Sequence, residues 1–349
     1  MKKAFPILVA GLVLVLAGCG RNADDWRPTW MDGCPRWSPD GSMIAFGRWN
    51  PYEDTDDGVY LYDVGRDDLR RLDPEYRDVL AWSQDGRDLI VTAEGGVARL
   101  SVGGGSSRRL VDLKARELAP LRDAEVTALL PSRDLKLLLI VIQRSSTTDD
   151  PSDYRKEVWL VQVDPPRARM LSLPTQNYVG GASWSQDERW IAYHDFKHIY
   201  LIRTDGSRRH VVPTKKGPAK PLFSPDGKKL VYFSGKEEGL FLVDLSSGTN
   251  RRLVKGDHNP IAWSRSGGRL LTRIYRTVAV LSATTGREIA RLPAFGDDWS
   301  TVACPAFSPD GSEIAFVRSW YYTLSPGSGA VYVAPASLTE IRSVRGVSR

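Results

Sequence analysis

Hydrophobic and polar positions alternate in short runs along most of this chain, with the period of two residues that is typical of β-strands. The clearest runs cover residues 43–46, 89–91, 230–233 and 314–316, and each follows a turn-like segment. A second apolar run comes further on in several cases, as at 59–62 and 240–243. No segment keeps a helical period over several turns. The pattern predicts an all-β chain of short antiparallel strands.

One five-residue phrase precedes these runs and returns along the chain. Its seven copies begin 39 to 53 residues apart, at Trp37, Trp82, Pro131, Trp184, Phe223, Trp263 and Phe307. The full form is aromatic-Ser-Pro-Asp-Gly, in which Pro suits the second position of a type I turn and Gly a left-handed backbone. Sequence periods of about 40–50 residues are typical of β-propeller blades.

Two copies depart from the phrase at its fifth position, which is Gly in the full form. Leu135 fills that position in the third copy and Glu188 in the fourth. A residue with a Cβ atom adopts a positive φ only at a cost in free energy. We therefore expect a different turn in these two copies.

The phrase, followed by an apolar strand, resembles the WD-like repeat of TolB-type β-propellers. The same repeat occurs in the propellers of prolyl-oligopeptidase-like and tricorn-type proteases. The resemblance covers residues 31–349 and implies a β-propeller of four-stranded blades. Seven copies of the phrase favour seven blades. Six blades is the alternative, if the weak copy at Pro131 belongs to an elaborated loop.

The N-terminus has the pattern of a bacterial lipoprotein signal peptide over residues 1–18. Lys2 and Lys3 precede an apolar run over residues 5–15 that is too short to span a bilayer comfortably. Leu16-Ala17-Gly18-Cys19 then resembles a lipobox, which implies cleavage before Cys19 and lipid attachment to its sulfur. Residues 19–30 form a short tether. The expected location is the cell envelope, on the periplasmic side of the outer membrane in a Gram-negative cell. An ordinary signal peptide is the alternative.

Composition excludes several classes of protein. The 349 residues are 42% hydrophobic and 26% charged, as in a soluble protein with a large core. The formal net charge is +6, and cleavage before Cys19 removes two lysines and leaves +4. That small excess of positive charge, on an exported chain, predicts no nucleic-acid partner.

Two cysteines stand at matching places in the first and last copies. Cys34 precedes Trp37 by three residues, and Cys304 precedes Phe307 by three. The first and last blades of a propeller are neighbours, and an exported protein meets oxidising conditions. We predict a disulfide between Cys34 and Cys304 that closes the ring, with two buried free thiols as the alternative.

The loops of the first and seventh blades are long and rich in aromatic and acidic residues. In propellers these loops emerge on one face, so they predict a contact surface at the junction of the two blades. Its members are Trp49, Tyr52, Asp297, Asp298, Trp299, Trp320, Tyr321 and Tyr322. The alternative is that these aromatic side chains pack the loops onto the propeller body.

No catalytic motif accompanies this pattern. The sequence holds no Gly-x-Ser-x-Gly, no His-Glu-x-x-His and no phosphate-binding Gly-x-x-x-x-Gly-Lys loop. His194, His198 and His210 lie in one repeat without the further ligands that a metal site needs, so no metal and no cofactor is predicted.

The leading interpretation is therefore a lipid-anchored, non-catalytic propeller that binds an envelope protein as a scaffold module. The membrane would be its second partner, through the lipid on Cys19. The alternative is a hydrolase or lyase of the envelope that acts on a glycan or a peptide, or a glycan-binding protein. Its ligand would be a small molecule or glycan, held at the aromatic and acidic face with carboxylates such as Glu53 and Asp54.

Overall fold

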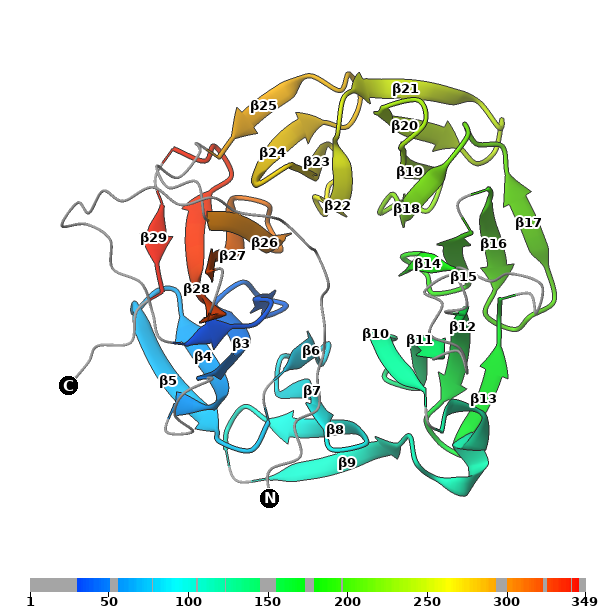
Figure 1. The fold of residues 1–349 in the computed structure, drawn as a ribbon. Coiled ribbons are helices and arrows are strands. Elements are labelled where there is room, and N and C mark those ends of the chain that lie inside the picture. Colours follow the sequence, from blue (N-terminus) through cyan, green and yellow to red (C-terminus); the bar gives the residue numbers. More distant parts are fainter. Residues whose placement is uncertain are drawn as a thin grey trace.

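The chain folds into short β-sheets arranged in a ring, as the alternating pattern predicts (Figure 1). The computed structural model describes residues 30–50, 56–76, 78–104, 106–122, 124–144, 155–172, 179–195, 197–292, 300–322, 325–339 and 341–344. Within these ranges no helix is long and apolar enough to cross a membrane. The fold class is a β-propeller.

The strands follow the seven copies of the repeat. The first copy contributes β1 (Met31–Asp32), β2 (Arg36–Trp37), β3 (Met43–Trp49), β4 (Gly58–Asp63) and β5 (Asp68–Asp73). The second contributes β6 (Val79–Trp82), β7 (Asp88–Ala93), β8 (Gly96–Ser101) and β9 (Ser107–Asp112). The third contributes a 3₁₀ helix η2 (Arg116–Leu121), β10 (Glu125–Pro131), β11 (Leu137–Arg144), β12 (Arg155–Gln162) and β13 (Arg167–Met170). The fourth contributes β14 (Gly180–Trp184), β15 (Trp190–His194), β16 (Ile199–Arg203) and β17 (Arg209–Val212).

The remaining three copies are built in the same way. The fifth contributes β18 (Pro218–Phe223), β19 (Lys229–Ser234), β20 (Gly239–Asp244) and β21 (Asn250–Lys255). The sixth contributes β22 (Asn259–Trp263), β23 (Arg269–Ile274), β24 (Thr277–Ser282) and β25 (Glu288–Arg291). The seventh contributes β26 (Ser300–Phe307), β27 (Glu313–Tyr322), β28 (Ser325–Pro335) and β29 (Arg342–Ser343). In the second to seventh units the first strand, from β6 to β26, is innermost and the last is outermost (Figure 1).

Hydrogen bonding gathers the described strands into six sheets, five of four strands and one of nine. The larger sheet joins the first and seventh repeat units, because β1 pairs in parallel with β28 and antiparallel with β3. The start of the propeller is thereby inserted between its last and first units. The weak third copy of the repeat builds a four-stranded sheet of its own, β10 to β13.

The hydrophobic core lies between neighbouring repeat units. Seven buried clusters are present in the described residues, and each joins two neighbouring repeat units. One cluster packs Phe46 and Tyr62 of the first unit against Val331 and Val333 of the seventh. Each sheet therefore gains most of its burial from its neighbours, as in repeat architectures generally.

The Ser and Asp of the repeat hold the turn between the innermost strand of each unit and the strand that follows it, such as β2 and β3 or β6 and β7. In all seven units the Ser hydroxyl accepts a backbone N–H from five residues later, at 2.9–3.0 Å. In six units the hydroxyl donates to the Asp carboxylate two residues on, at 2.5–2.9 Å. Ser266 replaces the Asp in the sixth unit, 3.2 Å from Ser264. These bonds satisfy buried polar groups and fix the turn.

The expectation of a different turn at Leu135 and Glu188 is wrong. Both residues adopt the left-handed conformation, with φ of 60° and 56°, close to the 68–78° of the glycines in the other units. The Ser and Asp bonds impose the turn, and tertiary contacts offset its cost. Glu188 accepts a 2.6 Å hydrogen bond from the backbone N–H of Arg133 in the preceding unit, a donor that Pro in that position would lack. Leu135 packs against a buried cluster.

The tryptophans of the repeat connect neighbouring units. Each indole Nε1 donates to the carbonyl of the residue just before the motif of the preceding unit. The pairs are Trp37 to Ala306 (3.2 Å), Trp82 to Arg36 (2.8 Å), Trp184 to Leu130 (3.1 Å) and Trp263 to Leu222 (3.4 Å). Phe223 and Phe307 cannot donate such a bond.

Arginines of the outermost strands make a second set of bonds between units. Arg70 donates to the Val102 carbonyl (2.9 Å), Arg251 to the Thr284 carbonyl (2.6 Å), and Arg169 to the Thr204 carbonyl. These arginines of the outermost strands therefore contribute to the contacts between neighbouring units.

Candidate functional site

Half of the contact surface predicted at the junction of the first and seventh blades lies outside the described residues, namely Tyr52, Asp297, Asp298 and Trp299. The carboxylates proposed for the alternative, Glu53 and Asp54, and the predicted lipidation site Cys19 lie outside them as well. Tyr321 and Tyr322 are placed in β27 as backbone only.

Trp320 does not belong to an exposed surface, which corrects the prediction. Its side chain is 1% exposed within the cluster between the sixth and seventh units, and the Arg318 guanidinium lies 4.7 Å from its ring centroid. Trp49 is half-buried, and its backbone pairs with Met31. For Trp320 the alternative of core packing is the correct one, because β27 turns this side chain inward.

The junction itself is closed by a disulfide and a buried ion pair. Cys34 and Cys304 are bonded, with their Cα atoms 5.2 Å apart. The Asp32 carboxylate accepts a 2.6 Å bond from Nε of Arg48 and a 3.1 Å bond from the backbone N–H of Val331. Burial raises the pKa of Asp32, against the opposing effect of the Arg48 charge. This cluster is explained by ring closure and offers no accessible reacting group.

A different group of residues lies on the first and second strands of the fourth to sixth units. Six inner strands shift register shortly before the motif aromatic. At this shift, three residues before that aromatic, Gly181 and Lys220 have φ of 55° and 53°, as does Cys304 at 50°. A lysine in the left-handed region is uncommon, and such conformations cluster at functional sites.

Lys220 is exposed and lies in a network of polar and cationic groups. Its Nζ donates to Oδ1 of Asn259 at 2.8 Å, and Asn259 Nδ2 donates to Asp257 at 2.5 Å. Arg273 pairs with Asn259 across β22 and β23, and its side chain is exposed. Desolvation by the surrounding protein and the Arg273 cation both lower the pKa of Lys220. The network therefore holds two basic side chains, Arg273 and a lysine whose lowered pKa lets it lose its proton more easily than usual.

His194 lies beside this network. It is 3% exposed, and burial lowers its pKa to about 4, so the imidazole is neutral at pH 7. A Cβ atom on Gly181 would lie 2.9 Å from Cδ2 of His194 and 3.0 Å from Cα of Lys220. Only glycine lets the His194 ring and the Lys220 backbone approach here. We call Lys220, Asn259 and Arg273, with His194 behind them, the rim cluster.

The position of the rim cluster follows from the strand order. The motif turns lie at one face of the ring, after the inner strands end. Lys220 lies early in β18 and Arg273 late in β23, so both lie toward the opposite face. This cluster could not be predicted from the sequence, because neither the positive φ of Lys220 nor the pairing of Asn259 with Arg273 corresponds to a recognisable sequence motif. The one available signal was that Gly181 and Lys220 share a position in the repeat.

Solved structures of the same fold include several enzymes. An oligogalacturonate lyase in complex with manganese matches 88% of this chain and 90% of its own, at 16% identity and a TM-score of 0.67. The oligogalacturonate lyase of Vibrio parahaemolyticus matches 90% and 94%, at 13% identity and a TM-score of 0.66. The dihydro-heme d1 dehydrogenase NirN, in complex with DHE, matches 90% and 66%, at 17% identity and a TM-score of 0.53.

Sequence comparison gives one curated relative and no matching family model. The relative is the uncharacterized peptidase YuxL of Bacillus subtilis (strain 168), which is 27% identical over 139 residues. The match covers 38% of this chain, and the chain spans about a fifth of that protein's length.

These comparisons overturn the interpretation as a non-catalytic scaffold. That interpretation rested on the view that propellers of this kind bind without reacting, whereas the matched lyases and the curated relative are named as enzymes. The alternative made from the sequence, action on a glycan or peptide, agrees better with them. What these likenesses share with the chain is the β-propeller fold.

The described residues do not fit a manganese site like the one that the name of the first lyase implies. Among them, no three His, Cys, Asp or Glu side chains come together as metal ligands. His258 is buried with Nδ1 3.2 Å from Oγ1 of Thr272, and the His210 ring packs at a tilt against Trp190, with ring centroids 5.5 Å apart. We therefore derive no step through a metal from these residues.

Proposed function

We propose that this protein acts on an acidic oligosaccharide at the rim cluster, as a lyase. The observation that carries the proposal is the network of Lys220, Asn259 and Arg273, in which Lys220 donates to the Asn259 side chain and Arg273 pairs with Asn259 from the next strand. A carboxylate-bearing sugar would be held by the Arg273 guanidinium, whose planar donors match a carboxylate. The likeness in fold to two oligogalacturonate lyases supports this class of substrate.

The lowered pKa of Lys220 suits it to act as the base. Its neutral amine takes the proton from the carbon next to the sugar carboxylate. The electron pair of that C–H bond forms a carbon–carbon double bond, and the glycosidic C–O bond breaks. The leaving oxygen takes a proton from water. Arg273 stabilises the negative charge that develops on the carboxylate during proton removal. His194 acts as a positioning residue, because its ring and the Lys220 backbone lie on either side of the space that a side chain at Gly181 would fill.

An assay of the products tests this proposal. Oligogalacturonate is incubated with the purified protein, and the ultraviolet absorbance of the unsaturated product is followed. We expect wild type to form this product and Lys220→Gln to lose the activity. Lys229→Gln, a matched change of an exposed lysine in the same unit, should keep it. Formation of new reducing ends without the unsaturated product would contradict elimination, and equal activity of both variants would remove Lys220 from the mechanism.

The lipid anchor on Cys19 and a location at the cell envelope are part of the same proposal. They rest on the lipobox-like sequence at 16–19. An anchored lyase would act on acidic glycans at the membrane surface. Metabolic labelling with a radioactive fatty acid tests the anchor, since Cys19→Ala should abolish the label.

A further inference from the structure

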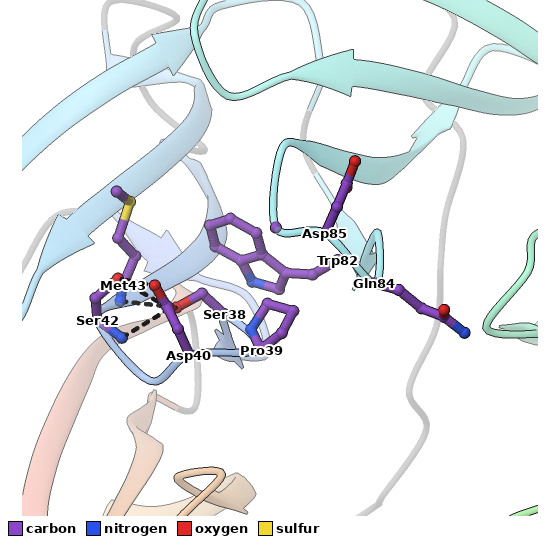
Figure 2. Close-up of a pocket in the computed structure, with 9 residues that line it drawn as sticks. Ser38, Pro39, Asp40, Ser42, Met43, Trp82, Gln84 and Asp85 are labelled. Carbon is purple, nitrogen blue, oxygen red and sulfur yellow. Dashed lines mark hydrogen bonds between the residues drawn. The ribbon is translucent and has the colours of Figure 1, made fainter.

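A pocket of about 300 Å³ lies at the face of the ring where the motif turns are, opposite the rim cluster. It lies between the turns of the first and second units, and its walls come from Pro39, Asp40, Met43, Trp82 and Asp85 (Figure 2). The volume is at the lower end of the range of small-molecule sites. No role in the proposed lyase reaction involves this pocket.

The indole of Trp82 is fixed in this pocket. Its Nε1 donates to the Arg36 carbonyl at 2.8 Å, so the ring cannot rotate freely, and the side chain is only half-buried. Figure 2 shows the indole next to Pro39 and Ser38, with Met43 on the same side. The pocket thus has one rigid aromatic wall and one flexible thioether, a combination that suits a compact organic group.

The charge around the pocket is negative. Asp40 has no basic residue in its turn, Ser38-Pro39-Asp40-Gly41-Ser42-Met43, whereas the turn of the fifth unit contains Lys228 and Lys229. Hydrogen bonds from Ser38 and Ser42 hold the pKa of Asp40 below its usual value, so the carboxylate is ionised at neutral pH. Asp85 adds a second carboxylate, with Arg87 beside it. The turn of the seventh unit continues this acidic side with Asp310, and its Pro309 would lie 3.4 Å from a Cβ on Gly41.

We infer that this pocket binds a small organic cation, with an alkylguanidinium or alkylammonium group on the indole face of Trp82 and beside the Asp40 carboxylate. A cation over an indole is attracted by the ring quadrupole, and an ionised carboxylate next to it adds a second attraction. A neutral ligand of the same shape gains neither. The site is thus specified by charge and by an aromatic wall, and it is independent of the proposed lyase function.

Calorimetric titration of the full-length chain with ethylguanidinium tests the inference, with ethylurea as a neutral ligand of matching shape. We expect saturable millimolar binding of ethylguanidinium and none of ethylurea. Asp40→Ser should weaken binding about fivefold, as expected for the loss of an exposed ion pair. This variant copies the sixth unit, where Ser266 holds the same turn, so it should fold. Met43→Lys, which places a competing cation in the pocket, should abolish binding.

Asp226→Ser is the matched control, because Asp226 holds the same position in the fifth unit, away from the pocket. It should bind ethylguanidinium as wild type does. Three outcomes would each overturn the inference. Wild type could bind ethylurea as tightly as ethylguanidinium, Asp226→Ser could lose as much affinity for ethylguanidinium as Asp40→Ser, or wild type could show no saturable binding. Failure of the lyase assay would leave this result unaffected.

Discussion

The side chain of Lys220 depends on a backbone conformation that its residue type disfavours. A left-handed φ costs a residue with a Cβ of order 1–3 kcal/mol, and the corresponding residue of the fourth unit is a glycine. The rim cluster keeps Lys220 there with a bond to Asn259 and with His194 packed behind it. Cys304 of the seventh unit has the same conformation at the same position, so this bulge accepts a side chain where tertiary contacts hold it.

The pH dependence of the reaction should report the environment of Lys220. Because desolvation and Arg273 lower its pKa, the ascending limb of kcat/KM should lie below the ordinary lysine pKa of about 10.4. Arg273→Gln removes a neighbouring cation, raises the pKa of Lys220 and should move the limb to higher pH. Arg269→Gln on the same strand should leave it in place. An unchanged limb in Arg273→Gln would contradict Lys220 as the base.

Glu188 offers a second prediction at the scale of one residue. Glu188→Ala keeps the left-handed strain and loses the bond from Arg133, so it should lower the free energy of unfolding by about 1 kcal/mol. Glu188→Gly loses the same bond but also removes the strain, so its stability should stay close to that of wild type. Urea denaturation measures both. A larger loss of unfolding free energy in Glu188→Gly than in Glu188→Ala would show that relief of backbone strain does not offset the lost hydrogen bond.

At the scale of the strand and turn, much of the architecture could be predicted from the repeat. The turn of Ser38 and Asp40 is encoded locally, so its seven copies predicted seven groups of strands. The parallel pairing of β1 with β28 could not be predicted, because it joins residues almost 300 positions apart. The burial of Trp320 was missed for a related reason. A long strand, β27, continues through the region that the sequence suggested was a loop.

The indole bonds between units give a prediction at this scale. Trp184→Phe should lose about 1 kcal/mol of unfolding free energy for the bond to the Leu130 carbonyl, in addition to the packing lost with the smaller ring, which a control variant measures. Trp190→Phe is the control, because its indole lies against His210 and makes no hydrogen bond among the described residues. Urea denaturation of the two variants compares them. Equal effects would mean that the indole bonds contribute nothing beyond packing.

At the scale of the whole molecule, stability depends on closing the ring. Cys34 and Cys304 are 270 positions apart, and Asp32, Arg48 and β1 complete the same junction. Opening so large a loop releases chain entropy worth roughly 5–6 kcal/mol in the entropic account of disulfides. Denatured, unreduced protein should therefore contain no Cys34 or Cys304 thiol in an Ellman titration. Reduction should lower the unfolding free energy by up to that amount. Two free thiols in unreduced protein would contradict the bond.

The two faces of the ring differ in the charge that they present to a ligand. The rim cluster carries Lys220 and Arg273 on one side, and the pocket at Trp82 carries Asp40 and Asp85 on the other. The two proposals therefore assign an anionic glycan to one face and a small organic cation to the other. Each site uses residues that differ from one repeat unit to the next. The fold permits this variation because the Ser and Asp bonds keep each turn intact.

The most direct test of the account is the affinity of the Lys220→Gln variant for an acidic oligosaccharide and for its neutral counterpart. Calorimetry would compare oligogalacturonate with the same oligosaccharide after its carboxylates are methyl-esterified. We predict saturable binding of the acidic form, much weaker binding of the ester, and loss of this preference when Arg273→Gln is added. Equal binding of the two forms, or an unchanged preference without Arg273, would contradict the claim that the rim cluster recognises an acidic glycan.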